Sequence, residues 1–218
     1  MPSRTTRNAI MGLSVTLALC VAQAAKAEEN PQAKVLQYRA ESGDAVQALL
    51  LQAPKSADTL TVRDHIVLVD TSASQNGGHR VQALATLDAF LANLAEGSRF
   101  RLFAVDVAPE ELTQGLTATT GASADRVRAL LARRAPLGAT DLGRAFQTAL
   151  DTAKVAKNAS VVYIGDGVSG LRLIPAARLQ TLVDGFRASE VAVNSYAIGP
   201  RRDLQLLGVI ANWTGGNV

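Results

Sequence analysis

The sequence predicts an α/β fold, in which a doubly wound, mostly parallel sheet has one antiparallel edge strand and helices on both faces. Short uninterrupted apolar runs, such as residues 65–70, are typical of strands that are buried on both sides. Segments with apolar residues at three- and four-residue spacing, typical of amphipathic helices, separate these runs. Strands and helices therefore alternate along the chain, which is the pattern of a parallel sheet with helical connections.

The first 27 residues have the layout of a secretory signal peptide. Arg4 and Arg7 form a basic start, an apolar stretch follows over residues 9–25, and Ala27 completes an A-x-A cleavage site. The apolar stretch is shorter than the roughly 20 residues that a membrane span needs. We therefore expect cleavage after Ala27, export to the periplasm, cell surface or medium, and no membrane insertion of the mature chain.

Loss of this segment changes both the charge and the cysteine content. The whole chain has 22 basic and 19 acidic residues, and three of the basic ones leave with the segment, so the mature chain is close to neutral. The mature sequence shows no basic patch of the kind that would indicate a nucleic-acid partner. Cys20, the single cysteine, also leaves, which excludes disulfides and thiolate metal sites.

The mature chain divides into a lead-in and one domain. Residues 28–60 are polar and mixed, with Pro31 and Pro54 as breakers, and are interpreted as a linker or lead-in. Within this segment, residues 44–51 could form a short helix. The domain is expected to span residues 61–218.

In the domain, each element is predicted from its apolar spacing and its breakers. Strands are predicted over residues 65–70, 100–105, 161–164 and 191–198, with a short edge strand over residues 111–118. Helices are predicted over residues 81–94, 124–134 with Ser123 as the cap, 141–157, 175–188 and 202–212. We expect the strand 65–70 to lie centrally, between the strands 100–105 and 161–164, and the strand 111–118 to be the antiparallel edge.

Oxygen-bearing side chains follow the predicted strands at three places. Asp70, Ser72 and Ser74 alternate after the first strand, where an extended loop would point all three the same way. Thr140 lies in a tight turn at a helix start, and Asp166 lies in a glycine turn after a later strand. Ligands of such sheets bind at the carboxyl ends of the strands. Two carboxylates and three hydroxyls, without nitrogen or sulfur, suit Mg²⁺, for which Mn²⁺ or Ca²⁺ could substitute.

These five residues resemble the metal-ion-dependent adhesion site (MIDAS) of the von Willebrand factor type A (vWA) family. The resemblance covers roughly residues 65–216 and includes all three loops in the right order. It implies a Rossmann-like domain that usually continues with a last strand and helix, so we expect either that the sequence is a fragment or that the domain lacks these last elements. It also implies that Ser72, Ser74 and Thr140 are direct metal ligands and that Asp70 and Asp166 act mainly through bound water. One coordination position would then be open to an Asp or Glu carboxylate of a partner protein.

The same loops allow two other interpretations. The segment 165–170 matches G-x-G-x-x-G, but a dinucleotide fingerprint belongs on the first strand and opens directly into a helix. A metal-dependent hydrolase or phosphatase using Asp70 and Asp166 would lack both a second aspartate two residues after Asp70 and a well-placed histidine base.

The leading hypothesis is an exported, non-catalytic domain that binds a protein through a metal, and a structural vWA domain without metal is a further alternative. His65 and His79 are expected to be structural or solvated, and Arg133 and Arg134 to be solvated surface charge.

Overall fold

The structure, a computed structural model, describes residues 33–39, 45–51, 61 and 63–218. It divides the chain into two units, residues 1–58 and 59–218, which are taken in turn below. The predicted signal peptide and its cleavage after Ala27 lie outside the described residues. None of the helices described is long and apolar enough to cross a bilayer.

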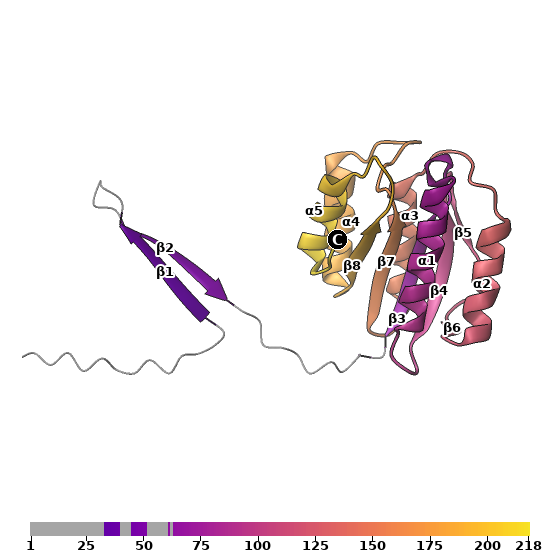
Figure 1. The fold of residues 1–218 in the computed structure, drawn as a ribbon, viewed down its shortest axis with the longest axis horizontal. Coiled ribbons are helices and arrows are strands. Elements are labelled where there is room, and N and C mark those ends of the chain that lie inside the picture. Colours follow the sequence, from indigo (N-terminus) through magenta and orange to yellow (C-terminus); the bar gives the residue numbers. More distant parts are fainter. Residues whose placement is uncertain (1–32, 40–44, 52–60, 62) are drawn as a thin grey trace, which may run out of the picture. The chain divides into compact units, whose positions relative to one another are not determined.

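In the first unit, two strands form an antiparallel pair (Figure 1). They are β1 (Ala33–Arg39) and β2 (Ala45–Leu51), with Gln37 opposite Gln47. The short helix expected over residues 44–51 is therefore wrong. A helix of so few residues is marginal in water, whereas pairing with β1 gives partners to the backbone groups between the two strands. The interpretation of residues 28–60 as a linker stays a prediction.

The second unit is built on a six-stranded sheet with the main order β5-β4-β3-β7-β8. Its parallel strands are β4 (Arg99–Val105), β3 (Asp64–Asp70), β7 (Ala159–Gly165) and β8 (Ala192–Ala197). The short strands β5 (Pro109–Glu111) and β6 (Thr117–Ala118) both pair with β4 in antiparallel fashion. The predicted central position of β3, between β4 and β7, is confirmed.

The antiparallel edge is confirmed, but it consists of two short strands rather than one over residues 111–118. Gly115 interrupts it with a φ of 77°, a conformation that ends an extended strand. The Glu111 carboxylate holds this turn by accepting the Gly115 N–H at 2.7 Å.

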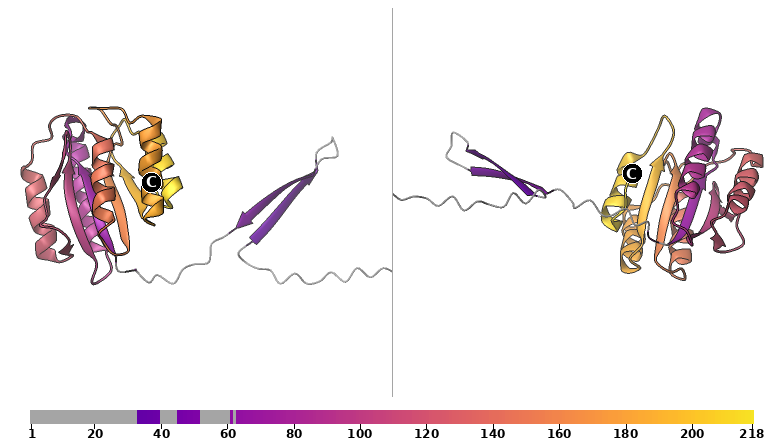
Figure 2. Two further views of the ribbon diagram at one scale, coloured as in Figure 1. Left: turned by 180° about the vertical axis from the view of Figure 1, so that it is seen from behind. Right: turned by 60° about the horizontal axis from the view of Figure 1, so that its bottom comes forward.

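Helices cover both faces of this sheet, which confirms the predicted fold class (Figure 2). They are α1 (Gly78–Ala92), α2 (Gly121–Arg133), α3 (Leu142–Ala153), α4 (Ala176–Ala188) and α5 (Leu204–Thr214). Alternate residues of β3 serve the two resulting cores. Ile66 and Leu68 belong to the core beneath α3, α4 and α5, whereas Val67 and Val69 belong to the core beneath α1 and α2.

The start of α2 differs from the prediction by three residues. Thr120 is its cap and accepts the Ser123 N–H at 3.2 Å, while the Ser123 hydroxyl accepts the Thr120 N–H at 2.9 Å. Ser123, predicted as the cap, is therefore the reciprocal partner of a capping box. Ser123 was rightly predicted to take part in capping, but it does so as the third residue of the helix.

Candidate metal centre

The predicted site residues lie at the carboxyl edge of the sheet, which is at the top of Figure 1: one is the last residue of β3 and the other four are on the loops that follow β3, precede α3 and follow β7. In chain order they are Asp70, Ser72, Ser74, Thr140 and Asp166. The ends of β3 and β7 meet there because the strands are parallel neighbours, with Val69 opposite Ile164. Four of the five residues are buried, and Ser74 is exposed.

The Asp70 carboxylate joins the loops through hydrogen bonds. Its Oδ1 accepts the Ser72 N–H at 2.9 Å, and the Thr140 hydroxyl lies 3.1 Å from both carboxylate oxygens. Its Oδ2 also accepts the Tyr163 hydroxyl at 2.9 Å. One carboxylate therefore orients the serine loop and the threonine loop together.

The serine loop is not the extended segment that was expected. Ser72 is extended, with φ −67° and ψ 170°, but residues Ala73–Gln75 form a 3-10 turn. The Gln75 N–H closes this turn on the Ser72 carbonyl at 3.0 Å, and the Ala73 N–H donates to the Gly138 carbonyl at 3.0 Å. The turn still brings the hydroxyls of Ser72 and Ser74 to within 3.0 Å of each other.

The Asp166 loop is held by its own backbone bonds. The Asp166 Oδ1 accepts the Val168 N–H at 2.9 Å, and its carbonyl accepts the Asp203 N–H at 2.8 Å. Leu171, farther along the loop, donates its N–H to the Thr140 carbonyl at 3.1 Å. The third loop is thereby fixed against the second.

The carboxylates of Asp70 and Asp166 give this edge of the sheet a negative electrostatic potential. Burial raises the pKa of the Asp70 carboxyl, hydrogen bonds from Ser72 oppose this rise, and the nearby charge of Asp166 adds to it. Neither carboxylate forms an ion pair with any residue that the structure describes. A buried negative charge without a positively charged partner costs free energy, so a cation bound between the two carboxylates would stabilise the folded domain.

The donor set fits a hard cation. Over the described ranges, no three His, Cys, Asp or Glu side chains are placed to share a metal, so hydroxyl oxygens would have to complete the ligand set. Carboxylate and hydroxyl oxygens are the ligands that Mg²⁺ prefers.

Tyr163 is a member of the site that the sequence analysis missed. It is fully buried in β7, and its hydroxyl accepts the Gly167 N–H at 3.1 Å while donating to Asp70. A usable signal was present, because a tyrosine inside a buried apolar strand must find a partner for its hydroxyl.

The glycines around Asp166 are explained by packing. A Cβ on Gly165 would lie 2.4 Å from the Tyr163 hydroxyl and 2.5 Å from the Asp70 Cβ. Gly167 has a φ of 77°, and a Cβ there would lie 2.8 Å from Leu207. Since α4 begins only at Ala176, the glycines do not open a helix as a dinucleotide fingerprint does.

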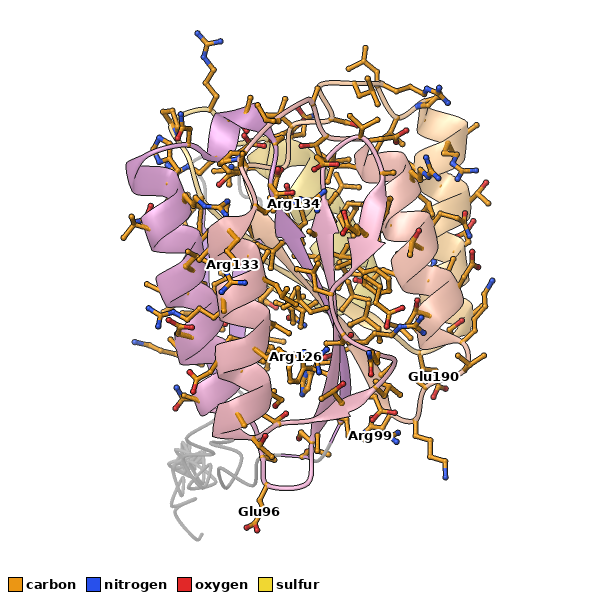
Figure 3. All side chains as sticks on the ribbon, turned by 90° about the vertical axis from the view of Figure 1, so that its right-hand side faces the viewer. Glu96, Arg99, Arg126, Arg133, Arg134 and Glu190 are labelled. Carbon is orange, nitrogen blue, oxygen red and sulfur yellow. The ribbon has the colours of Figure 1, made fainter. Side chains whose placement is uncertain are left out.

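Arg134 is not the solvated surface charge that was expected. Its guanidinium forms ion pairs with Asp106 at 2.8 Å and with Glu110, and its Nε donates to the Thr71 hydroxyl at 3.2 Å. Thr71 lies between Asp70 and Ser72, so this arginine supports the serine loop from outside. Figure 3 shows Arg134 near the carboxyl edge and Glu96 at the opposite end of the domain.

Comparisons with known proteins agree with this architecture. A sequence profile described as von Willebrand factor type A domain matches residues 64–218. Similar solved structures include a von Willebrand factor type A protein from Catenulispora acidiphila, with a TM-score of 0.60 and 19% identity over 80% of this chain and 41% of that chain. The SpRpn10 VWA domain has a TM-score of 0.57 and 17% identity over 72% of this chain and 86% of that chain.

A third similar structure is an aerotolerance-related membrane protein from Bacteroides fragilis NCTC 9343. Its TM-score is 0.54 and its identity 14%, over 72% of this chain and 90% of that chain. A comparison with curated proteins gave no match. At these identities the structural similarity shows the fold alone, and the match spans less than half of the Catenulispora chain.

Proposed function

Because the chain belongs to the von Willebrand factor type A domain family, whose domains are generally non-catalytic interaction domains, we propose that it binds a partner protein through a MIDAS-type metal. The proposed place of action is outside the cytoplasm, after removal of residues 1–27. The observation that carries the proposal is the convergence of five oxygen-bearing side chains, two of them carboxylates, on one edge of the sheet.

The hydroxyls of Ser72, Ser74 and Thr140 would hold Mg²⁺ directly, and Asp70 and Asp166 would hold it through water. Mn²⁺ or Ca²⁺ could take its place. The hydrogen bonds of Asp70 suit this division of roles. The Thr140 hydroxyl donates a hydrogen bond to Asp70, which leaves the lone pairs of its oxygen for the cation. Asp70 also orients the serine loop by accepting the backbone N–H of Ser72.

The bound ion would supply an electrophilic position for an Asp or Glu carboxylate of the partner. Two carboxylates that act through water neutralise a divalent ion less than direct ligation does. The domain's own residues would hold the metal ion and orient the partner's carboxylate, and no covalent bond would be made or broken.

The hydrolase alternative finds little support in the site. Asp70 is 1% exposed, and hydrogen bonds occupy both of its oxygens, so it is poorly placed to attack a substrate. His65 lies at the opposite end of β3, where its Nδ1 is 2.8 Å from the Ser160 hydroxyl. It cannot serve this edge of the sheet as a base.

Calorimetric titration of the purified protein with MgCl₂ tests the proposal. Thr140→Ala removes one hydroxyl ligand and should weaken Mg²⁺ binding roughly tenfold to a hundredfold, by analogy with other losses around metal ligands. Thr181→Ala, an exposed threonine on α4, is the matched control and should bind as the wild type does. EDTA should release a captured partner. Wild-type protein that binds no divalent ion, or a partner that ignores both EDTA and Thr140→Ala, would indicate a structural domain instead.

A further inference from the structure

A pocket of 620 Å³ opens beside the loop that carries Thr140. Three arginines line it, and we call it the arginine pocket. Arg144 comes from the first turn of α3, Arg172 from the loop after β7, and Arg178 from the first turn of α4. Arg172 and Arg178 are six positions apart in the sequence, whereas Arg144 lies 28 positions before Arg172, so the tertiary structure brings α3 to the other two.

The positive charge of this pocket is not neutralised. None of the three guanidiniums takes part in an ion pair within the described ranges, and Arg178 only donates to the Gln147 Oε1 at 3.3 Å. Among the lining residues described, one is acidic. This is Asp141, whose carboxylate caps α3 by accepting the Arg144 N–H at 3.0 Å. The pocket therefore offers a positive field to an anion.

The start of α4 strengthens this field. Its cap residue is Pro175, which has no side-chain hydrogen bond to the helix, so the first N–H groups of α4 have no capping oxygen. Free N–H groups and the helix dipole both favour negative charge at this place.

Hydrogen bonds fix the arginine pocket to the candidate metal centre. The Ser169 hydroxyl accepts the Leu142 N–H at 3.2 Å and donates to the Arg172 carbonyl at 2.5 Å. The Leu171 N–H donates to the carbonyl of Thr140 itself. The loop that carries Arg172 is thus hydrogen-bonded to the loop that carries a predicted metal ligand, so the two sites are neighbours in the fold.

We propose that the arginine pocket binds further acidic side chains of the same partner segment whose first carboxylate occupies the metal centre. This inference rests on the proposed function and narrows it, because the partner must then present several Asp or Glu residues in one segment. Arginine suits the task, since its planar guanidinium pairs with a carboxylate through two parallel hydrogen bonds. A polypeptide supplies both the metal-bound carboxylate and its neighbours, which favours carboxylates over phosphates as the pocket's ligand.

Two fluorescent peptides probe the idea with the purified protein. The first carries one Asp among Gly and Ser, and the second carries the same Asp followed by several Glu residues. Fluorescence anisotropy in MgCl₂ should show roughly tenfold tighter binding of the second peptide, as expected for a few exposed ion pairs. This preference should shrink as NaCl screens the charges.

The variant pair Arg144→Glu and Arg172→Glu should abolish the preference for the acidic peptide. The matched control is Arg126→Glu with Arg133→Glu, which reverses the charge at two exposed positions on α2 (Figure 3). This control should keep the preference for the acidic peptide. Circular dichroism checks that both double variants are folded. Glu at position 144 would lie in the first turn of α3, where negative charge is tolerated.

The outcomes separate this inference from the function on which it rests. Binding of the single-Asp peptide that ignores EDTA contradicts the metal site. Residual binding of the acidic peptide in EDTA that the pocket variants abolish still supports the arginine pocket. Equal affinity for both peptides, a preference that the pocket variants keep, or no binding of the acidic peptide overturns the inference. Tighter binding of a phosphoserine peptide of equal charge would overturn the assignment to carboxylates.

Discussion

The hydroxyl of Tyr163 has two partners, the carboxylate of Asp70 at 2.9 Å and the N–H of Gly167 at 3.1 Å. Burial raises the pKa of this phenol well above its usual value, and the negative charge of Asp70 raises it further. The hydroxyl therefore keeps its proton and remains a donor to Asp70. A single buried side chain thus holds the central carboxylate of the site against the loop that carries Asp166.

Tyr163→Phe should destabilise the protein by about 1–2 kcal/mol, because Asp70 loses a buried donor while the ring still fills its place. It should also weaken Mg²⁺ binding roughly tenfold, as losses behind metal ligands commonly do. Urea unfolding and calorimetric titration measure the two effects. Tyr196→Phe, at a site 45% exposed, is the control. Equal stability losses in both variants, or unchanged Mg²⁺ affinity in Tyr163→Phe, would contradict this role.

Among the elements, β7 is the one whose end shapes the site. It closes against β3 at Gly165, which leaves no room for a side chain between Tyr163 and Asp70. The loop after it then carries Asp166, returns to Thr140 and ends at the start of α4. The strand end thus positions both the candidate metal centre and the arginine pocket.

Gly165→Ala should cost about 1–3 kcal/mol of unfolding free energy, since the added methyl forces its neighbours apart in a packed core. Gly78→Ala is the matched control, because Gly78 begins α1 with open space around its Cα and no positive φ. That change should be neutral or stabilise by up to about 1 kcal/mol. Denaturant unfolding of both variants decides the matter, and a Gly165→Ala protein as stable as the wild type would show that β7 is not closely packed here.

At the scale of the whole domain, the carboxyl and amino ends of the parallel strands carry different kinds of residues. The carboxyl edge carries the candidate metal centre, whereas the opposite edge has structural polar contacts. There His65 is 8% exposed, bonds to Ser160 and packs its ring edge-on against Phe90. Burial and, to a smaller extent, the charge of Arg63 lower the pKa of His65 from 6.5 to about 4.

This lowered pKa should make stability fall in mild acid. The folded protein keeps His65 neutral, but the unfolded chain takes up a proton near pH 6.5, so the stabilisation is complete above that pH. It should be lost progressively as the pH falls from 6.5 toward 4, by about 1–3 kcal/mol in total. Urea unfolding at pH 7 and pH 4.5 should show a smaller loss for His65→Gln than for the wild type. His79→Gln, at a half-buried position on α1, should retain the wild-type loss, and identical pH profiles for all three proteins would contradict the assignment.

The kinds of elements in the domain, their order and the edge that carries the candidate site could be predicted from the amino-acid pattern. The unbroken apolar run of β3 is typical of a strand that is buried on both faces. The three- and four-residue spacing of apolar residues in α3 is typical of a helix that is buried on one side. Parallel strands place their carboxyl ends at one edge, so side chains that follow different strands were expected to meet there. These features depend on local periodicity and on general rules of connection, which the residues themselves record.

The side-chain contacts of the site could not be predicted in this way. Tyr163 reaches Asp70 across 93 positions of sequence, and Arg134 reaches Thr71 across 63. The arginine pocket likewise depends on the approach of α3 to the loop after β7 and the start of α4. The physical reason is that such contacts are set by how packed elements approach one another in space, whereas the apolar spacing of a segment reports only which of its faces is buried.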